Sequence, residues 1–280
     1  MRTGAVLAVL LAAVACDRGP APSADAQPVH QASVQPALAP APKPEQPATL
    51  RGVVRWKGPT LEPSRIIMSG DDFAVAAWPD GWPPDPRFEV AEGGGLPNTF
   101  VWAAEGPHKG RNWDTPATPA ELGAERRMFV PHVLGVQCGQ PIEFRTRDGQ
   151  HYNFHARPKV NRNQIDVCVE ERGVWATGHS KYLREPNANV FRFEQPELAI
   201  PVYGNLLSWM SAWICVVDHP FFAVTDASGH FEIRGLPPGD YVFKVWHEGT
   251  TAEASLKGHM AETKVTLASG AETTVDFDLR

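Results

Sequence analysis

The chain contains more proline and glycine than is usual for a protein of long helices or of uninterrupted β-sheets. The 280 residues include 27 prolines and 24 glycines. Proline breaks helices and removes ladder hydrogen bonds, and glycine weakens both kinds of element. The content therefore argues against a helix bundle or a doubly wound α/β enzyme and favours a loop-rich β protein. A hydrophobic content of 42% still provides for a packed core.

The charge balance is mildly acidic. Lys and Arg number 26 against 32 Asp and Glu, which gives a net charge of −6. The sequence has no basic run, so we expect no nucleic-acid partner.

The first 15 residues have the pattern of a signal peptide. A short positive start precedes an apolar run over residues 4–15. The run is shorter than the roughly 20 residues that span a bilayer, but it suits a signal-peptide core. Small residues lead directly into Cys16, which resembles a bacterial lipobox and predicts lipidation of that cysteine. The alternative is an ordinary secretory signal with an incidental Cys16.

Residues 16–48 are predicted to be a disordered linker behind the lipidated cysteine. Positions 17–48 hold eight prolines and no aromatic residue. Such a segment buries too little apolar surface to offset the entropy of ordering, and it serves as a spacer. We therefore expect a membrane-tethered lipoprotein of the bacterial cell envelope, periplasmic or surface-facing. Inner and outer membrane remain open.

From residue 49 onward the pattern changes to short alternating segments separated by turns. No long stretch has the 3.6-residue period of a helix, so we predict an all-β fold of sandwich type. Segments 60–95 and 104–128 are predicted to be surface loops. The expected strands are 50–56, 98–103, 133–136, 141–145, 152–156, 198–202, 212–217, 221–225, 230–233, 241–246, 262–267 and 273–279.

The C-terminal part resembles a known module. The matching stretches are residues 222–233 and 235–241, in which Asp226 and Gly229 are expected to form a hairpin turn. They resemble the carboxypeptidase regulatory-like (transthyretin-like) module, a β-sandwich with a carbohydrate-binding-like fold. The strand at 50–56 resembles the first strand of that module. The resemblance therefore implies one sandwich built from residues 49–58 plus 218–280.

The middle of the chain resembles a second family. The matching stretches are residues 131–133, 139–144, 148–156 and 208–213. They resemble periplasmic proteins that fuse a plastocyanin-like (cupredoxin) domain to the regulatory-like module. The resemblance implies a cupredoxin-like β-sandwich over residues 93–217, with residues 59–92 as a loop-rich connection.

The copper ligands of that family are missing at the matching positions. A blue-copper site needs two imidazoles, a thiolate and a weak axial thioether. Keeping the family's motifs in register places Tyr152, Gly204 and Leu207 at the first histidine, the cysteine and the second histidine. Met210 alone remains, and a lone thioether does not hold copper. The resemblance thus implies a degenerate, copper-free domain with no cofactor.

A relocated metal site is the competing interpretation. Its potential ligands are His151, His155, Cys168 and Cys215. On a strand, four residues separate the two histidines by about 13 Å along one face, so they chelate only if the segment turns. Cys138, Cys168 and Cys215 also allow one disulfide, and the sequence does not choose among the three pairings.

Enzymatic motifs are absent from the sequence. It contains no Gly-x-Ser-x-Gly, no phosphate-binding glycine loop and no convincing pair of carboxylates. We therefore expect a non-catalytic binding or adaptor protein whose partner is an envelope protein or a glycan. Carbohydrate binding is the alternative, and periplasmic electron transfer through copper is a second one. Tryptophans in or near the long loops are the candidate binding surface: Trp78, Trp82, Trp102 and Trp113.

Overall fold

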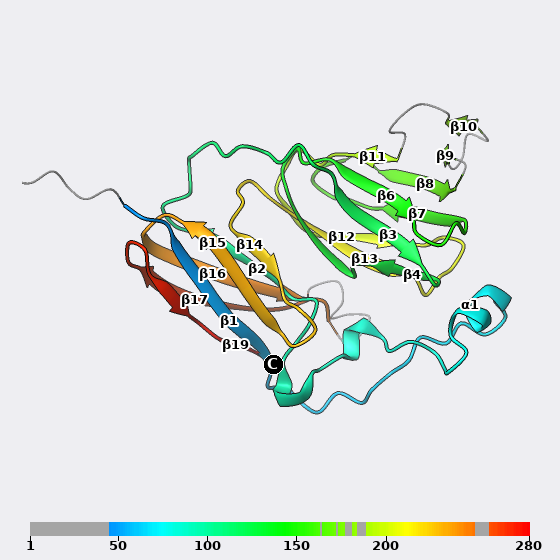
Figure 1. Cartoon of the computed structure of the whole chain (residues 1–280), viewed down its shortest axis with the longest axis horizontal. Helices are drawn as coiled ribbons and strands as arrows, with labels where there is room; N and C mark the ends of the chain where they lie inside the picture. The colour runs from blue at the N-terminus through cyan, green and yellow to red at the C-terminus, as the bar shows by residue number, and fades with distance from the viewer. Residues whose placement is uncertain (1–44, 163, 172, 177–180, 184–188, 250–257) are drawn as a thin grey trace, which may run out of the picture. The chain divides into compact units, whose positions relative to one another are not determined.

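The computed structural model describes residues 45–162, 164–171, 173–176, 181–183, 189–249 and 258–280 (Figure 1). The predicted signal peptide, the predicted lipidation of Cys16 and nearly all of the predicted linker lie outside these residues. Within them, no helix is long and apolar enough to cross a membrane.

The described chain is built almost entirely of β-strands, which form two sandwiches. The central sandwich contains β3 (Ala120–Glu125), β4 (Met128–Val130), β5 (Val133–Gln137), β6 (Ile142–Thr146), β7 (Tyr152–Ala156), β8 (Ile165–Glu170), β9 (Gly173–Ala176), β10 (Lys181–Leu183), β11 (Val190–Phe191), β12 (Glu197–Tyr203) and β13 (Ser211–Val217). The terminal sandwich contains β1 (Ala48–Trp56), β2 (Phe100–Glu105), β14 (Phe222–Val224), β15 (His230–Leu236), β16 (Gly239–His247), β17 (His259–Leu267), β18 (Glu272–Thr274) and β19 (Phe277–Leu279).

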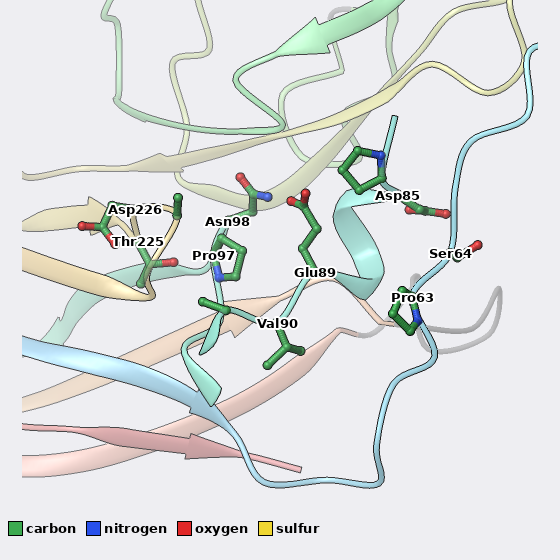
Figure 2. A pocket seen from close by; sticks show the side chains of 12 residues that line it. Pro63, Ser64, Asp85, Glu89, Val90, Pro97, Asn98, Thr225 and Asp226 are labelled. Atoms are coloured by element: carbon green, nitrogen blue, oxygen red, sulfur yellow. The ribbon is translucent and has the colours of Figure 1, made fainter. Parts of the chain in front are cut away.

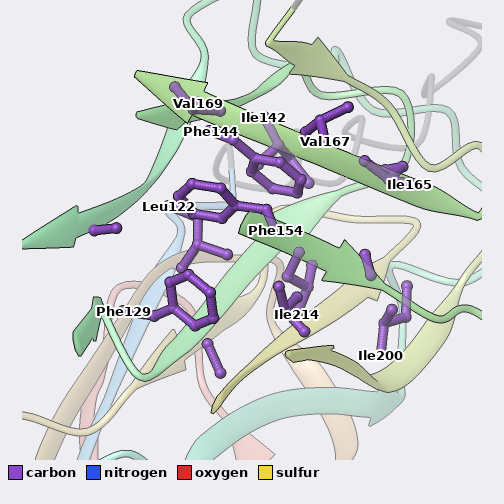
Figure 3. Packing of buried hydrophobic residues seen from close by; sticks show 14 of the residues in the cluster. Leu122, Phe129, Ile142, Phe144, Phe154, Ile165, Val167, Val169, Ile200 and Ile214 are labelled. Carbon is purple, nitrogen blue, oxygen red and sulfur yellow. The ribbon is translucent and has the colours of Figure 1, made fainter. Parts of the chain in front are cut away.

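Two sheets enclose the core of the central sandwich. One has the strand order β10-β9-β8-β7-β12-β13-β5 and the other β11-β6-β3-β4. Inward-facing residues of both sheets form one buried cluster, and its aromatic rings stack in the middle (Figure 3). The ring centroids of Phe144 and Phe154 are 4.9 Å apart with nearly parallel planes.

Both ends of the described chain contribute to the terminal sandwich. The first strand, β1, pairs antiparallel with β15 and parallel with β18 and β19. The second sheet has the order β14-β2-β16-β17. The sequence-based boundary at residue 93 is therefore wrong, because β2 pairs with β14 and β16 rather than with any strand of the central sandwich. The central sandwich begins at β3.

The two sandwiches pack through strand β13. Every residue of β13 after Ser211 is buried, because one face covers the central core and the other faces the terminal sandwich. A separate cluster joins the outer face of β13 to β2, β5 and β16. Within this cluster the rings of Trp213 and Trp246 meet edge to face, with centroids 5.4 Å apart.

The predicted loops contain regular structure that the sequence analysis did not predict. Segment 60–95 holds helix α1 (Asp72–Ala77) and the short 3-10 helices η1 (Pro86–Phe88) and η2 (Glu92–Gly94). Segment 104–128 holds β3, which pairs in parallel with β6. Helix α1 begins where the Asp71 side chain accepts a hydrogen bond from Ala74 N–H, and six residues are too few for a helical period to be visible.

Candidate functional site

The four positions that the sequence analysis assigned to copper ligands lie in the central sandwich, and the assignment itself stays a prediction. Tyr152 and Met210 are 1% and 2% exposed and share the central core, and Leu207 packs against it. The Gly204 amide donates to the Met210 carbonyl oxygen at 3.1 Å, and the Met210 amide donates to the Leu207 carbonyl oxygen at 2.9 Å. The two hydrogen bonds join Gly204, Leu207 and Met210 in the turn between β12 and β13.

A second contact fixes the register between the two runs that carry these positions. The Asn205 amide donates to Asn153 Oδ1 at 2.8 Å. Asn153 follows Tyr152 and Asn205 follows Gly204 in the chain. The hydrogen bond therefore holds the backbone of Tyr152 near that of Gly204.

The Tyr152 phenol is fully engaged by its neighbours. Its hydroxyl donates to Asp148 Oδ2 at 2.7 Å and accepts from the Arg127 amide at 3.2 Å. Burial and the Asp148 carboxylate raise the pKa of Tyr152, so the phenol stays neutral. Burial alone would raise the pKa of Asp148, but its hydrogen bonds from Tyr152, Arg126 and Gln150 lower it. The position thus presents an uncharged phenol that already has both a donor and an acceptor partner.

The residues proposed for a relocated metal site do not converge. His151 Nδ1 lies 3.3 Å from Glu170, and His155 Nδ1 lies 3.0 Å from Asn205 Oδ1. The Cys168 sulfur lies 3.7 Å from the side-chain Nδ2 of Asn153, whereas Cys215 belongs to the cluster between the sandwiches. Within the described residues, no three His, Cys, Asp or Glu side chains form a group that fits a metal ion.

The three described cysteines are free thiols. Burial raises the pKa of Cys215 to about 12 and that of Cys138 to about 11, and it raises the pKa of Cys168 as well. None of the pairings that the sequence leaves open is formed among these described residues. The raised pKa values also make each thiol a poor nucleophile at neutral pH.

The four candidate tryptophans are half-buried and contact different parts of the chain. Trp78 donates its indole N–H to the Arg126 carbonyl oxygen at 2.8 Å and lies under the Arg126 guanidinium. Trp102 stacks on Phe100 in β2, and Trp113 meets Phe221 edge to face at 4.7 Å. Trp82 lies in the segment after α1, where its carbonyl oxygen accepts a hydrogen bond from Arg65. Trp78 and Trp113 thus contact segments far away in the sequence, and Trp102 packs within its own strand.

A pocket of about 460 Å³ lies between the connecting segment and the β14–β15 hairpin (Figure 2). Asp85, in the pocket wall, forms an ion pair with Arg87. Asp226 Oδ1 accepts hydrogen bonds from the backbone amides of Ser228 and His230. Glu89 lies between Asn98 and Asp85, and burial raises its pKa. None of the twelve described residues that line the pocket is aromatic, so it offers no stacking face for a sugar ring.

A buried polar network that the sequence analysis missed joins the two sandwiches. Glu248, 3% exposed, follows β16 and accepts a hydrogen bond from Trp213 Nε1 at 2.7 Å. The other carboxylate oxygen of Glu248 is hydrogen-bonded to Nε2 of His132, which lies just before β5. Burial alone would raise the pKa of Glu248, but His132 and Trp213 lower it, so the carboxylate is ionised. After β13, His219 Nδ1 accepts a hydrogen bond from the Phe221 amide at 3.1 Å.

Comparison with known proteins gives one domain family and weak structural similarities. The family model for the carboxypeptidase regulatory-like domain matches residues 213–280. No curated protein matches the chain. A reduced tryptophan-to-tyrosine mutant of amicyanin is 11% identical, with a TM-score of 0.26 over 35% of this chain and 81% of that one. The copper-containing nitrite reductase of Thermus scotoductus is 14% identical, with a TM-score of 0.26 over 39% of this chain and 26% of that one.

Proposed function

We propose that this chain is a non-catalytic binding or adaptor protein of the bacterial cell envelope, whose central sandwich is a cupredoxin-like scaffold without copper. The proposal depends mainly on one observation. The positions that motif register assigns to three copper ligands hold a hydrogen-bonded phenol, a glycine and an aliphatic side chain. Only Met210 resembles a ligand there, and three losses together are more than one neighbouring side chain can replace.

Tethering is the second part of the proposal. A lipid on Cys16 would hold the chain at the membrane, and the proline-rich residues that follow would space the sandwiches from it. The two sandwiches would then present loops to an envelope protein or a glycan. Two of the three described thiols are buried, and Asp85 in the pocket wall is paired with Arg87, which supports a role without catalysis.

A copper titration with a restored-site control tests the proposal. Addition of Cu²⁺ to the full chain is expected to produce no thiolate-to-copper charge-transfer band. The matched control carries Tyr152→His, Gly204→Cys and Leu207→His, which supply the missing ligands beside Met210. A Cβ at Gly204 would lie 3.0 Å from the Leu207 carbonyl oxygen and 3.1 Å from the Met210 Cβ, so the loop must shift by only a few tenths of an ångström. We expect the band in the control alone.

The two proteins together make the result decisive. A band in the wild-type chain would show that another thiol and other imidazoles form a copper site, and the electron-transfer alternative would then replace this proposal. No band in either protein, with the control shown to be folded by circular dichroism, would mean that the four positions do not converge and would remove the observation on which the proposal depends.

A further inference from the structure

The chain passes from one sandwich to the other twice, and a buried histidine lies in each connection. The first connection leads from β2 to β3 and contains His108, and the second leads from β13 to β14 and contains His219. Both residues are 2% exposed. Their ring centroids are 4.3 Å apart with the rings edge to face, so the two imidazoles are in direct contact. The pair therefore joins the two connections.

His108 attaches the first connection to the terminal sandwich. It is the one buried residue among residues 106–119, since all the others are exposed or half-buried. Its ring lies parallel to that of Tyr241 on β16, with centroids 5.8 Å apart. The attachment of this segment therefore depends on the surroundings of a single imidazole, together with the contact of the half-buried Trp113 with Phe221.

A backbone hydrogen bond fixes the protonation state of His219. The Phe221 amide donates to His219 Nδ1 at 3.1 Å. Because an N–H donates, Nδ1 must present its lone pair, and the ring is neutral with its proton on Nε2. Protonation of Nδ1 would break this hydrogen bond and place a buried charge against the ring of His108. The geometry thus requires a neutral ring at this position.

Burial opposes a positive charge on either ring. It lowers the pKa of His219 to about 4, with a further contribution from His108, and it lowers the pKa of His108 as well. A histidine in water has a pKa of about 6.5, so each ring binds a proton more readily once it is exposed. The state with both rings buried is therefore favoured above pH 6.5, and this advantage declines as the pH falls toward 4.

The titratable groups packed around the pair come from several elements. Lys109 of the first connection lowers both pKa values, whereas Asp218, directly after β13, raises both. Glu105, at the end of β2, raises the pKa of His108. Tyr241 on β16 stays neutral, since burial raises its pKa to about 12. The two carboxylates weaken the effect of burial on the histidines but do not reverse it.

We propose that His108 and His219 form an acid-sensitive contact, which holds residues 106–113 on the terminal sandwich at neutral pH and releases them when the pair is protonated. Release would separate the two connections and uncover one face of the Tyr241 ring. The apolar cluster around β13 contains neither histidine, so we expect the change to be local. Acidification would thus alter the surface that the chain presents beside the first connection. The proposal does not depend on the positions assigned to copper ligands.

Hydrogen exchange of the full chain at pH 7 and pH 5, corrected for the intrinsic pH dependence of exchange, tests this contact. Peptides that cover residues 104–113 and 218–222 should exchange at least about tenfold faster at pH 5, because a pKa difference of one unit corresponds to a tenfold change in an equilibrium. Peptides from β13 and β17 should keep their protection. At pH 5 the carboxylates whose pKa values the fold lowers, among them Glu248 and Glu197, are still ionised.

Two variants remove titration from the pair while retaining its packing. His219→Asn keeps an acceptor for the Phe221 amide, and His108→Phe keeps a ring against Tyr241. Each should reduce the acceleration at pH 5 by at least about threefold, which corresponds to half a pKa unit. The matched control is His230→Gln at an exposed histidine on β15, which should behave like the wild type.

Equal protection of the wild-type segment at both pH values would overturn the proposal. Acceleration that persists in the double variant His108→Phe/His219→Asn would also overturn it, and would point to another group such as His247, whose pKa burial lowers to about 4. Faster exchange over the whole chain at pH 5 would contradict a local release. If His219→Asn does not fold, an NMR titration of the wild-type histidine ring protons decides, because the pair should titrate together with the loss of protection. A pair that titrates while residues 106–113 stay protected would overturn the proposal.

Discussion

Replacing Glu248 by alanine is expected to destabilise the folded chain by about 2–6 kcal/mol, because it removes the shared acceptor of two buried donors, each of which costs about 1–3 kcal/mol when left unsatisfied. Glu248 is the shared acceptor of His132 Nε2 and Trp213 Nε1. Its loss would leave both donors buried between the sandwiches. Urea unfolding followed by tryptophan fluorescence would measure the loss, since Trp213 and Trp246 lie in the affected cluster.

A surface carboxylate provides the control for Glu248. Glu262 on β17 pairs with Lys244 at 3.0 Å, and its side chain is 59% exposed. Exposed pairs contribute about 0–1 kcal/mol, so Glu262→Ala should change the free energy of unfolding by no more than that. Equal effects of the two substitutions would show that the Glu248 network contributes no more than a solvated ion pair.

Replacing Gly135 by valine is expected to destabilise the chain by about 3 kcal/mol, at the upper end of the usual cost of overpacking. Gly135 lies on β5, where a Cβ would stand 2.7 Å from the ring of Phe222 and 2.8 Å from that of Phe100. Both rings belong to the terminal sandwich, and Phe100 is fully buried. Glycine is therefore needed at this point for the two sandwiches to approach each other.

A double-variant cycle distinguishes this steric effect from a general weakness of β5. Phe222→Ala removes one of the two rings that meet residue 135. In that background Gly135→Val should cost at least about 1 kcal/mol less, because residues in contact couple by about 0.5–3 kcal/mol. Strictly additive effects of the two substitutions would contradict the close approach.

Local turn chemistry was predictable from the sequence. Asp226 and Gly229 form the expected hairpin turn, in which the Gly229 amide donates to the Asp226 carbonyl oxygen at 2.9 Å. Gly229 has a φ of +80°, a conformation that glycine adopts without strain. Such a turn depends on four neighbouring residues, so its signal is complete within a short window.

The strand assignments were less complete. Strand β8 alternates in the sequence Ile-Asp-Val-Cys-Val-Glu, yet the sequence analysis did not predict it. The boundary of the central sandwich failed for a different reason. Strand β2 has the composition of a strand in either sandwich, and only its pairing with β14 and β16 assigns it to the terminal one.

The polar contacts between the sandwiches could not be predicted at all. Glu248 is separated from Trp213 by 35 residues and from His132 by 116. The assignment of Tyr152, Gly204, Leu207 and Met210 to ligand positions came from motif register alone and stays a prediction, although the Asn205 amide does donate to Asn153 Oδ1.

The copper content of the full chain as isolated tests the central claim most directly. Mass spectrometry of the metal content, combined with an optical spectrum, should show no stoichiometric copper and no thiolate-to-copper band, because Tyr152, Gly204 and Leu207 supply neither imidazole nor thiolate. One copper ion per chain together with such a band would contradict the account and would make electron transfer the leading function.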